Sequence, residues 1–178
     1  MRIIAGSLGG RVFESPGTHK IHPMSDRVKG ALFNVLGDVD DLAVLDAFAG
    51  SGALGFEAAS RGAKHVTLID NDRVAQKTIE QNIQILGLTR VVKLIKASAN
   101  AWLSTTKEVQ FDIVLCDPPY DNLQHSLLTR LAEKVATQGV IVFSLPPKAE
   151  VSLPETIFKR AAAKDYGDAR LVFYRRIR

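Results

Sequence analysis

The chain has 178 residues, of which 46% are hydrophobic and 24% are charged, and its formal net charge is +4. This composition is typical of one globular domain and excludes a disordered or fibrous chain. A single cysteine excludes an internal disulfide framework, and no Cys/His cluster has metal-ligand spacing. No apolar run approaches the roughly 18 residues of a membrane span, and the N-terminus lacks the apolar stretch of a secretory signal. We therefore expect one cytoplasmic domain over residues 1–178, with no membrane contact.

The charge is distributed unevenly along the chain. Residues 1–36 hold five basic and two acidic residues, and residues 159–178 hold seven basic and two acidic residues. The stretch between them holds eleven basic against fifteen acidic residues. Basic ends around an acidic centre are typical of a protein that holds a polyanion at its periphery, but two solvated basic termini explain the pattern equally well.

The first 37 residues predict a small N-terminal extension. Arg2–Ala5 and Arg11–Phe13 are expected to form two short strands of a hairpin around a glycine-rich turn. A loop with Pro23 follows. Ser25 is then placed to cap a helix, which Gly37 ends.

From Ala43 onward, short apolar runs alternate with helical stretches. Asp72–Leu86 and Asn122–Thr137 carry apolar residues on one face, as expected of helices. The apolar runs are typical of parallel strands covered on both faces, and they are Ala43–Leu45, Val66–Ile69, Val91–Ile95, Phe111–Cys116 and Val140–Phe143. This alternation predicts an α/β fold with a doubly wound, mostly parallel sheet. Ile157–Ala163 and Arg170–Ile177 predict an antiparallel hairpin at the sheet edge.

A glycine-rich turn follows the first strand of the alternating region. Gly50, Gly52 and Gly55 match the G-x-G-x-x-G dinucleotide fingerprint, and Asp70 lies at a suitable distance along the chain to reach a ribose. Glycine-rich turns of this kind also occur for packing alone. The fingerprint by itself therefore leaves both interpretations open.

Two carboxylates help to decide which nucleotide the turn would hold. Asp46 and Asp117 follow strands that are neighbours in this topology. They would repel the pyrophosphate of NAD by an energy on the order of several kcal/mol in a partly dry cleft. S-adenosylmethionine (AdoMet) instead carries a sulfonium and an ammonium, and its own carboxylate suits the helix N-terminus near Gly52. Electrostatics therefore favour AdoMet over NAD.

The tetrapeptide Asp117-Pro118-Pro119-Tyr120 directly follows the apolar run Phe111–Cys116. Its two prolines fix the backbone and remove two N–H donors, so the turn offers acceptors and one aromatic ring. Such a pocket suits a planar exocyclic amino group, whose hydrogens Asp117 and the Pro118 carbonyl can accept while Tyr120 stacks on the base. Methyl transfer from the sulfonium would then depend mainly on positioning. The alternative is an ordinary strand-ending turn with a packed tyrosine.

Other reactive side chains in the sequence are not expected to take part. Adjacent strand residues point to opposite faces, so Cys116 should be buried and directed away from Asp117. The four histidines, among them His19 and His22, have no carboxylate partner at a useful spacing. Tyr166 either contacts RNA or closes the C-terminal turn.

Several segments together resemble one protein family. Asp117–Tyr120 is similar to the (N/D)-P-P-(Y/F) motif of amino-group N-methyltransferases. With Arg2–Gly6, Ser25–Val28, Ala31–Asn34 and Asp46–Gly62, the chain resembles the bacterial 16S ribosomal RNA guanine-N2 methyltransferase D family over nearly its whole length. The resemblance implies a Rossmann-like class I methyltransferase that uses S-adenosyl-L-methionine to methylate the 2-amino group of one guanine in 16S rRNA. The expected substrate is the assembled or assembling 30S subunit, and the expected state is a monomer.

The resemblance also assigns roles to individual residues. The cofactor-binding positions are Asp46, Phe48, Gly50, Gly52, Asp70, Asn71, Ser98 and Ala99, and the catalytic positions are Asp117, Pro118, Pro119 and Tyr120. Residues 1–37 are expected to face the RNA and residues 43–178 to form the AdoMet-binding core. The candidate phosphate contacts are Arg2, Arg11, Arg27 and Lys29. Ser98 stands where the family usually carries an aspartate near the adenine amino group, so this chain lacks a charge there.

Two alternative functions remain open from the sequence. DNA adenine and protein glutamine N-methyltransferases use similar acceptor-rich turns, although their motif more often begins with Asn. The 178 residues also leave little room for a separate DNA-recognition domain. An NAD-binding Rossmann oxidoreductase fits the glycine pattern but is opposed by Asp46 and Asp117.

Overall fold

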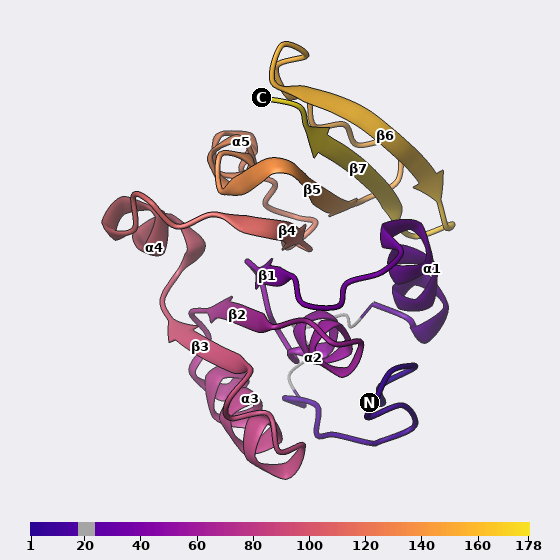
Figure 1. The fold of residues 1–178 in the computed structure, drawn as a ribbon, viewed down its shortest axis with the longest axis vertical. Coiled ribbons are helices and arrows are strands. Elements are labelled where there is room, and N and C mark those ends of the chain that lie inside the picture. The colour runs from indigo at the N-terminus through magenta and orange to yellow at the C-terminus, as the bar shows by residue number, and fades with distance from the viewer. Residues whose placement is uncertain (18–23) are drawn as a thin grey trace.

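The structure is a computed structural model that describes residues 1–17 and 24–178; His19, His22 and Pro23 lie outside the described residues. The strands of the described residues are β1 (Ala43–Asp46), β2 (His65–Asp70), β3 (Val92–Lys96), β4 (Phe111–Cys116), β5 (Val135–Leu145), β6 (Phe158–Asp165) and β7 (Arg170–Arg176). They form one sheet in the order β3-β2-β1-β4-β5-β7-β6 (Figure 1).

The strand directions confirm the predicted sheet. β1 pairs in parallel with β2 and β4, and β3 and β5 extend this parallel sheet on either side. β7 is antiparallel to β5, and β6 is antiparallel to β7, so the C-terminal segment forms the expected hairpin at the edge. The chain winds outward from β1 to β3 and then in the opposite direction from β4. The carboxyl ends of β1 and β4 therefore flank the point where strand order reverses, which is where open α/β sheets bind ligands.

Helices cover both faces of the sheet and enclose two hydrophobic cores. They are α1 (Asp26–Leu36), α2 (Ala53–Ser60), α3 (Arg73–Ile85), α4 (Ala99–Thr105) and α5 (His125–Ala132). Because successive strand residues point to opposite faces, Val44 of β1 joins the core with α1, α2 and α3, whereas Leu45 joins the core with α4 and α5. The near-continuous apolar strands of the sequence thus have two buried faces.

The boundaries of α1 follow the predicted capping signals. The Ser25 hydroxyl accepts a hydrogen bond from the amide of Val28, and Gly37 ends α1 with a φ of 79°. Asp72 caps α3 by accepting two backbone amides of the first turn. The side chains of Ser25 and Asp72 thus accept hydrogen bonds from first-turn amides, which have no carbonyl partner within the helix.

The predicted helix over Asn122–Thr137 is too long. Helix α5 ends at Ala132, and β5 begins at Val135, which pairs with Phe111 of β4. Val135 continues the helical spacing of the apolar residues before it, but it is fully buried in the sheet. Periodicity alone does not separate a buried helical turn from the start of a buried strand. The N-terminal part of β5 was therefore missed.

The N-terminal segment contains one isolated β-bridge and is hydrogen-bonded to α2. The two predicted strands reduce to one antiparallel bridge between Arg2 and Val12. Glu57 of α2 is completely buried and accepts hydrogen bonds from the amides of Ile4 and Ala5 at 2.8 and 3.0 Å. A charged acceptor that binds two backbone amides fixes the segment more firmly than apolar packing alone.

Candidate active site

Three carboxylates lie at the carboxyl edge of the central strands. Asp46 is the last residue of β1, Asp70 is the last residue of β2, and Asp117 follows β4. β1 lies between β2 and β4 in the sheet, with Asp46 in register with Leu68 and Leu115. The strand order therefore brings together the acidic residues that the sequence predicts for a cofactor site.

Asp46 is a buried carboxylate without a hydrogen-bond donor. The residue is 1% exposed, and no group among the described residues donates to either of its carboxylate oxygens. Burial first, and then the charge of Asp117, raise the pKa of Asp46 to about 7; the amides of Phe48 and Gly55 offset part of the rise without completing hydrogen bonds. Phe48 itself packs partly buried against the core under α4 and α5. An unpaired buried carboxylate is costly, so the site offers an acceptor to a cation.

The glycine-rich turn is fixed to the neighbouring strand. The amide of Gly50 donates to the Asp70 carboxylate at 2.7 Å, which ties the turn to the end of β2. Gly52 has a φ of 82°, and a side chain there would meet the Phe56 ring at 2.6 Å. A side chain at Gly55 would collide with β2. The close approach of α2 to the sheet therefore requires Gly55, and the left-handed backbone conformation favours glycine at Gly52, as in nucleotide-binding turns of this fold.

The remaining predicted cofactor residues lie at the ends of β2 and β3. Asp70 also accepts a hydrogen bond at 2.8 Å from the amide two residues further on, and burial raises its pKa. Ser98 is the N-cap of α4, and its hydroxyl oxygen accepts the amide of Ala101 at 3.2 Å. Ala99 is buried and Asn71 is exposed. Ser98 thus caps α4, in addition to its predicted role in cofactor binding.

The Asp117–Tyr120 turn places its functional groups at the same edge. Burial raises the pKa of Asp117 to about 6, while the hydroxyl of Ser144 lowers it. Pro118 is buried, and Pro119 is exposed. Tyr120 is 40% exposed, and its phenolic oxygen lies 3.0 Å from the Ser144 hydroxyl. The ring is therefore anchored at its polar end while much of its surface remains accessible for stacking.

Ser144 is the site residue that the sequence analysis missed. It lies in β5 and is 2% exposed. Cys116 and Phe143 form the last residue pair of β4 and β5, and Asp117 and Ser144 each follow this pair by one residue. A serine directly after the apolar run Val140–Phe143 was the available signal, because it stands where a parallel strand reaches the ligand-binding edge.

The candidate phosphate contacts of the N-terminal segment differ in accessibility. Arg2, Arg11 and Arg27 are exposed. Arg2 forms an ion pair with Asp26 at 2.9 Å, and Arg11 donates to the carbonyl of Ile85 at 2.9 Å. Exposed arginines with such weak surface contacts remain able to bind phosphate.

The prediction that Lys29 contacts an RNA phosphate is wrong. It is fully buried, and its Nζ donates to the carbonyl of Arg2 at 2.8 Å and lies 4.0 Å from the Glu57 carboxylate. Burial lowers the pKa of Lys29, and the charges of Glu57 and Asp26 oppose this effect. Lys29 therefore holds the N-terminal segment in place and is not accessible to a phosphate group.

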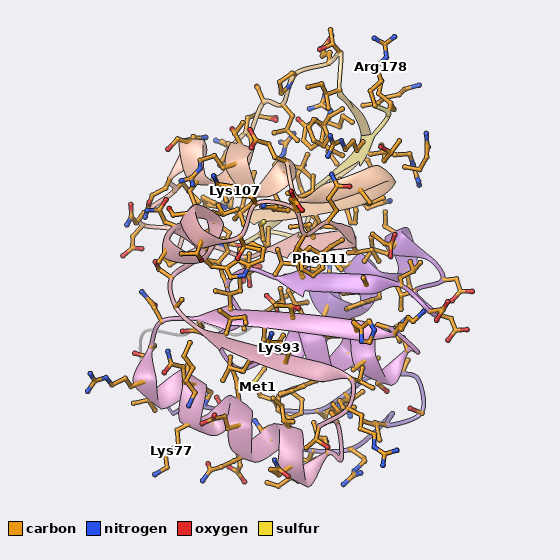
Figure 2. All side chains as sticks on the ribbon, turned by 60° about the vertical axis from the view of Figure 1, so that its left-hand side comes forward. Met1, Lys77, Lys93, Lys107, Phe111 and Arg178 are labelled. Atoms are coloured by element: carbon orange, nitrogen blue, oxygen red, sulfur yellow. The ribbon has the colours of Figure 1, made fainter. Side chains whose placement is uncertain are left out.

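The two chain termini lie apart, although α1 of the basic N-terminal stretch packs in the same hydrophobic cluster as β7 of the basic C-terminal stretch. Met1 lies on the side of α2 and α3, while Arg178 lies at the opposite end of the sheet, beyond β7 (Figure 2). Lys159 and Lys164 of the edge strand β6 are exposed.

Other features of the described residues lie outside this site. Cys116 is buried and has no disulfide partner. The described part of the chain contains no cluster of three or more His, Cys, Asp or Glu residues placed to hold a metal ion. No helix within residues 1–17 and 24–178 is both long and apolar enough to cross a membrane.

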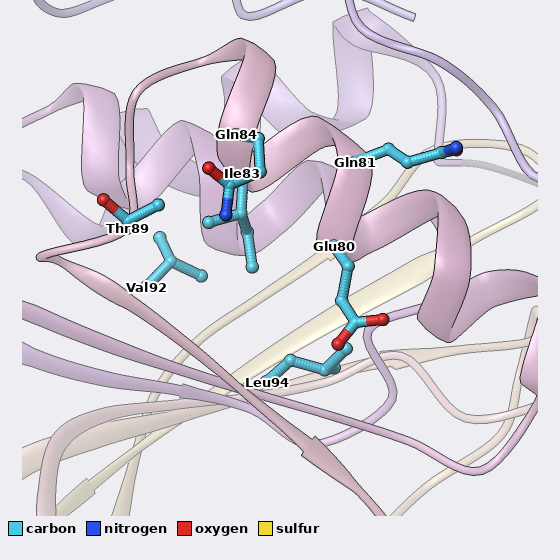
Figure 3. A pocket seen from close by; sticks show the side chains of 7 residues that line it. All are labelled: Glu80, Gln81, Ile83, Gln84, Thr89, Val92 and Leu94. Atoms are coloured by element: carbon cyan, nitrogen blue, oxygen red, sulfur yellow. The ribbon is translucent and has the colours of Figure 1, made fainter.

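A hollow near the sheet edge is separate from the strand ends. It measures about 530 Å³ and lies between the C-terminal half of α3 and the start of β3, lined by Ile83, Gln84, Thr89 and Val92 among others (Figure 3). These residues lie toward the amino end of β3, whereas Ser98 follows its carboxyl end. The hollow is therefore not part of the candidate active site.

Known proteins with similar sequences match most of this chain. The profile of the family described as "Conserved hypothetical protein 95" matches residues 1–175. The chain belongs to this family. "Ribosomal RNA small subunit methyltransferase D" of Haemophilus influenzae is 36% identical over 137 residues, which are 75% of this chain and 71% of the relative. The protein of the same name from Buchnera aphidicola subsp. Acyrthosiphon pisum is 34% identical over 164 residues, covering 89% and 85% of the two chains.

The solved structures agree with this assignment. The Escherichia coli protein yhhF is 30% identical, has a TM-score of 0.86, and the match covers 99% of this chain and 98% of that chain. The family resemblance predicted from the sequence is thereby confirmed, as is the Rossmann-like class I methyltransferase fold.

Proposed function

We propose that this chain is an AdoMet-dependent methyltransferase of 16S rRNA and that it methylates the 2-amino group of a guanine. The observation that supports the proposal most strongly is Asp46, a buried carboxylate without a donor at the glycine-rich turn. A cationic ligand would satisfy this carboxylate, and AdoMet combines cationic groups with the adenosine that such a turn accommodates.

The residues of the site fit AdoMet better than NAD. Asp46 would hold the ammonium end, Asp70 the ribose, and Phe48, Asn71, Ser98 and Ala99 would surround the rest of the nucleoside. A pyrophosphate over the same turn would meet the negative charges of Asp46 and Asp117, which already raise each other's cost of ionisation. When bound, AdoMet supplies an electrophilic methyl group.

The Asp117–Tyr120 turn would orient the amine that receives the methyl group. Asp117 and the carbonyl of Pro118 accept the amino hydrogens, which directs the nitrogen lone pair toward the methyl donor. Asp117 has a pKa of about 6, so it is ionised at neutral pH and is a stronger base than an ordinary carboxylate. It can therefore take the proton that the amine loses, while Tyr120 stacks on the base.

The chemistry of this turn favours guanine as the target base. The 2-amino group of guanine lies next to N1–H, so two hydrogen-bond donors are presented side by side. Adenine presents its amino group next to the acceptor N1. Asp117 has two carboxylate oxygens, so it can accept N1–H and one amino hydrogen of guanine while the Pro118 carbonyl accepts the other amino hydrogen; with adenine, one carboxylate oxygen would face the acceptor N1 instead.

The relatives support ribosomal RNA as the substrate. Those from Haemophilus influenzae and Buchnera aphidicola are named as methyltransferases of the ribosomal RNA small subunit. We propose that this chain acts as a cytoplasmic monomer on the assembled or assembling 30S subunit. Residues 1–37, with exposed Arg2, Arg11 and Arg27, would face the RNA, and residues 43–178 would form the AdoMet-binding core.

The proposal is tested by offering several methyl acceptors in parallel. Tritiated AdoMet and the protein are incubated with 30S subunits from a strain that lacks the modification, naked 16S rRNA, duplex DNA and a protein release factor. Label is expected in the 30S subunit or the 16S rRNA. Asp117→Ala should retain AdoMet binding and lose the label, and the matched control Asp121→Ala, at an exposed carboxylate in the following loop, should retain both.

The other outcomes identify the alternatives. Label in DNA or in the release factor, with none in rRNA, would assign the protein to the DNA adenine or protein glutamine N-methyltransferases. Tight binding of NAD without affinity for AdoMet would instead indicate an oxidoreductase.

A further inference from the structure

One buried hydroxyl lies between two groups of the catalytic turn. Ser144 is 2% exposed, and its Oγ lies 3.0 Å from the phenolic oxygen of Tyr120. Continuing the β4–β5 register from Cys116 and Phe143 sets Asp117 beside Ser144 on the adjacent strand. The carboxylate, the hydroxyl and the phenol are therefore neighbours, and they come from two different elements of the fold.

The chemistry of the three groups determines the direction of the hydrogen bonds. An ionised carboxylate can only accept, and a serine hydroxyl has one proton to donate. A Ser144 hydroxyl that bridged an ionised Asp117 and Tyr120 would therefore donate to the carboxylate and accept the phenolic proton. The lowering effect of Ser144 on the pKa of Asp117 agrees with this direction, because a donor stabilises the charged carboxylate.

We infer that Ser144 is a positioning residue of the methyl-transfer site, which keeps Asp117 in its amine-accepting form and fixes the ring of Tyr120 for stacking. The inference rests on the proposed function, since an amino acceptor is what both residues would orient. The hydroxyl leaves the other lone pairs of the Asp117 carboxylate available to the substrate. A serine that only satisfied the phenol of Tyr120 would have no effect on Asp117.

The groups around Asp117 act in opposite directions on its ionisation. Asp46 faces it from β1 and competes with it for ionisation, and Tyr120 lies in its own turn, with Asp168 facing that phenol from the β6–β7 turn. The hydroxyl of Ser144 favours the ionised form. Removal of this hydroxyl should therefore raise the pKa of Asp117.

The test compares Ser144→Ala with Ser144→Thr, which keeps the hydroxyl, and with Ser152→Ala, an exposed serine, as control. The Asp117 carboxyl carbon is titrated by NMR in the absence of RNA, with Asp117→Asn used for assignment. Ser144→Ala should move the midpoint to higher pH, Ser144→Thr should return it toward the wild-type value, and Ser152→Ala should leave it unchanged.

The same variants are then assayed with 30S subunits. Ser144→Ala should lower kcat about tenfold, as expected when one hydrogen bond to a charged group is lost. The acidic limb of its pH–rate profile should move to higher pH, while the Kd for AdoMet stays within about twofold. A residue with only a packing role would lower thermal stability without moving this limb.

An unchanged Asp117 titration in Ser144→Ala would overturn the inference. If that variant does not fold, Ser144→Cys, which keeps the volume and donates only weakly, is titrated in its place with the same two outcomes. The titration needs no methyl acceptor. A shifted midpoint in a protein that labels no RNA would thus retain the link between Ser144 and Asp117 and overturn only the proposed function.

Discussion

Asp46→Asn should make the ligand-free protein more stable at alkaline pH. Burial, followed by the charge of Asp117, raises the pKa of Asp46 to about 7 in the folded chain, whereas an aspartate in an unfolded chain titrates near 3.9. Between these values the folded state holds a proton that the unfolded state has released. Its stability therefore falls as the pH rises through this window, by up to roughly 4 kcal/mol at pH 8.

Asparagine keeps the shape of the side chain and removes this cost. Asp46→Asn is expected to raise the midpoint of thermal unfolding by on the order of 10 °C at pH 8. The gain should shrink to less than half at pH 5, where wild-type Asp46 is already protonated in the folded state. Differential scanning calorimetry at the two pH values measures both gains.

The same change should weaken AdoMet binding. The ammonium of the ligand loses its charged partner, which is worth about 1.5–3 kcal/mol, so the Kd measured by calorimetry should rise about 10- to 150-fold at pH 8. Asp121→Asn removes an exposed charge and serves as the control. If Asp46→Asn were less stable than wild type at pH 8 and bound AdoMet with unchanged affinity, Asp46 would neither destabilise the ligand-free protein nor bind the ammonium of AdoMet.

Three further changes test other parts of the account. Asp117→Asn should lower kcat by about 10²- to 10⁴-fold with AdoMet affinity retained, and an unchanged rate of tritium transfer would remove Asp117 from proton acceptance. Lys29→Met should lower the free energy of unfolding by about 1–3 kcal/mol, measured in urea, because the Arg2 carbonyl loses a buried donor and the buried Glu57 carboxylate loses a nearby positive charge; a loss below about 0.5 kcal/mol would contradict this role. Arg27→Ala should leave stability unchanged but reduce the salt dependence of 30S binding by about one counterion, whereas an unaltered slope would place Arg27 away from the RNA backbone.

The parts of the fold that could be predicted are those in which local sequence and global topology agree. Each parallel strand is a short apolar run, and Asp46, Asp70 and Asp117 each stand at a strand end. Because parallel strands share one carboxyl edge, these residues meet in any doubly wound sheet. The cap at Ser25 could be predicted for a similar reason, since it acts on an amide only three residues further along the chain.

The features that could not be predicted depend on contacts between distant segments. Lys29 has an ordinary sequence context, but the N-terminal segment folds back over it and buries it against Glu57. Val135 has helical spacing, but its pairing with Phe111 decides in favour of a strand. The link between Ser144 and Tyr120 spans 24 residues and follows from the position of β5 beside β4.

Nucleoside analysis of the methylated RNA is the decisive test of methylation at the guanine 2-amino group. Unmodified 30S subunits are incubated with the wild-type protein and methyl-labelled AdoMet, and their 16S rRNA is digested and separated by liquid chromatography and mass spectrometry. The label is expected to co-elute with N2-methylguanosine and to be absent with Asp117→Ala. Label in a methylated adenosine, in a ring-carbon-methylated pyrimidine or in a ribose-methylated nucleoside would contradict it.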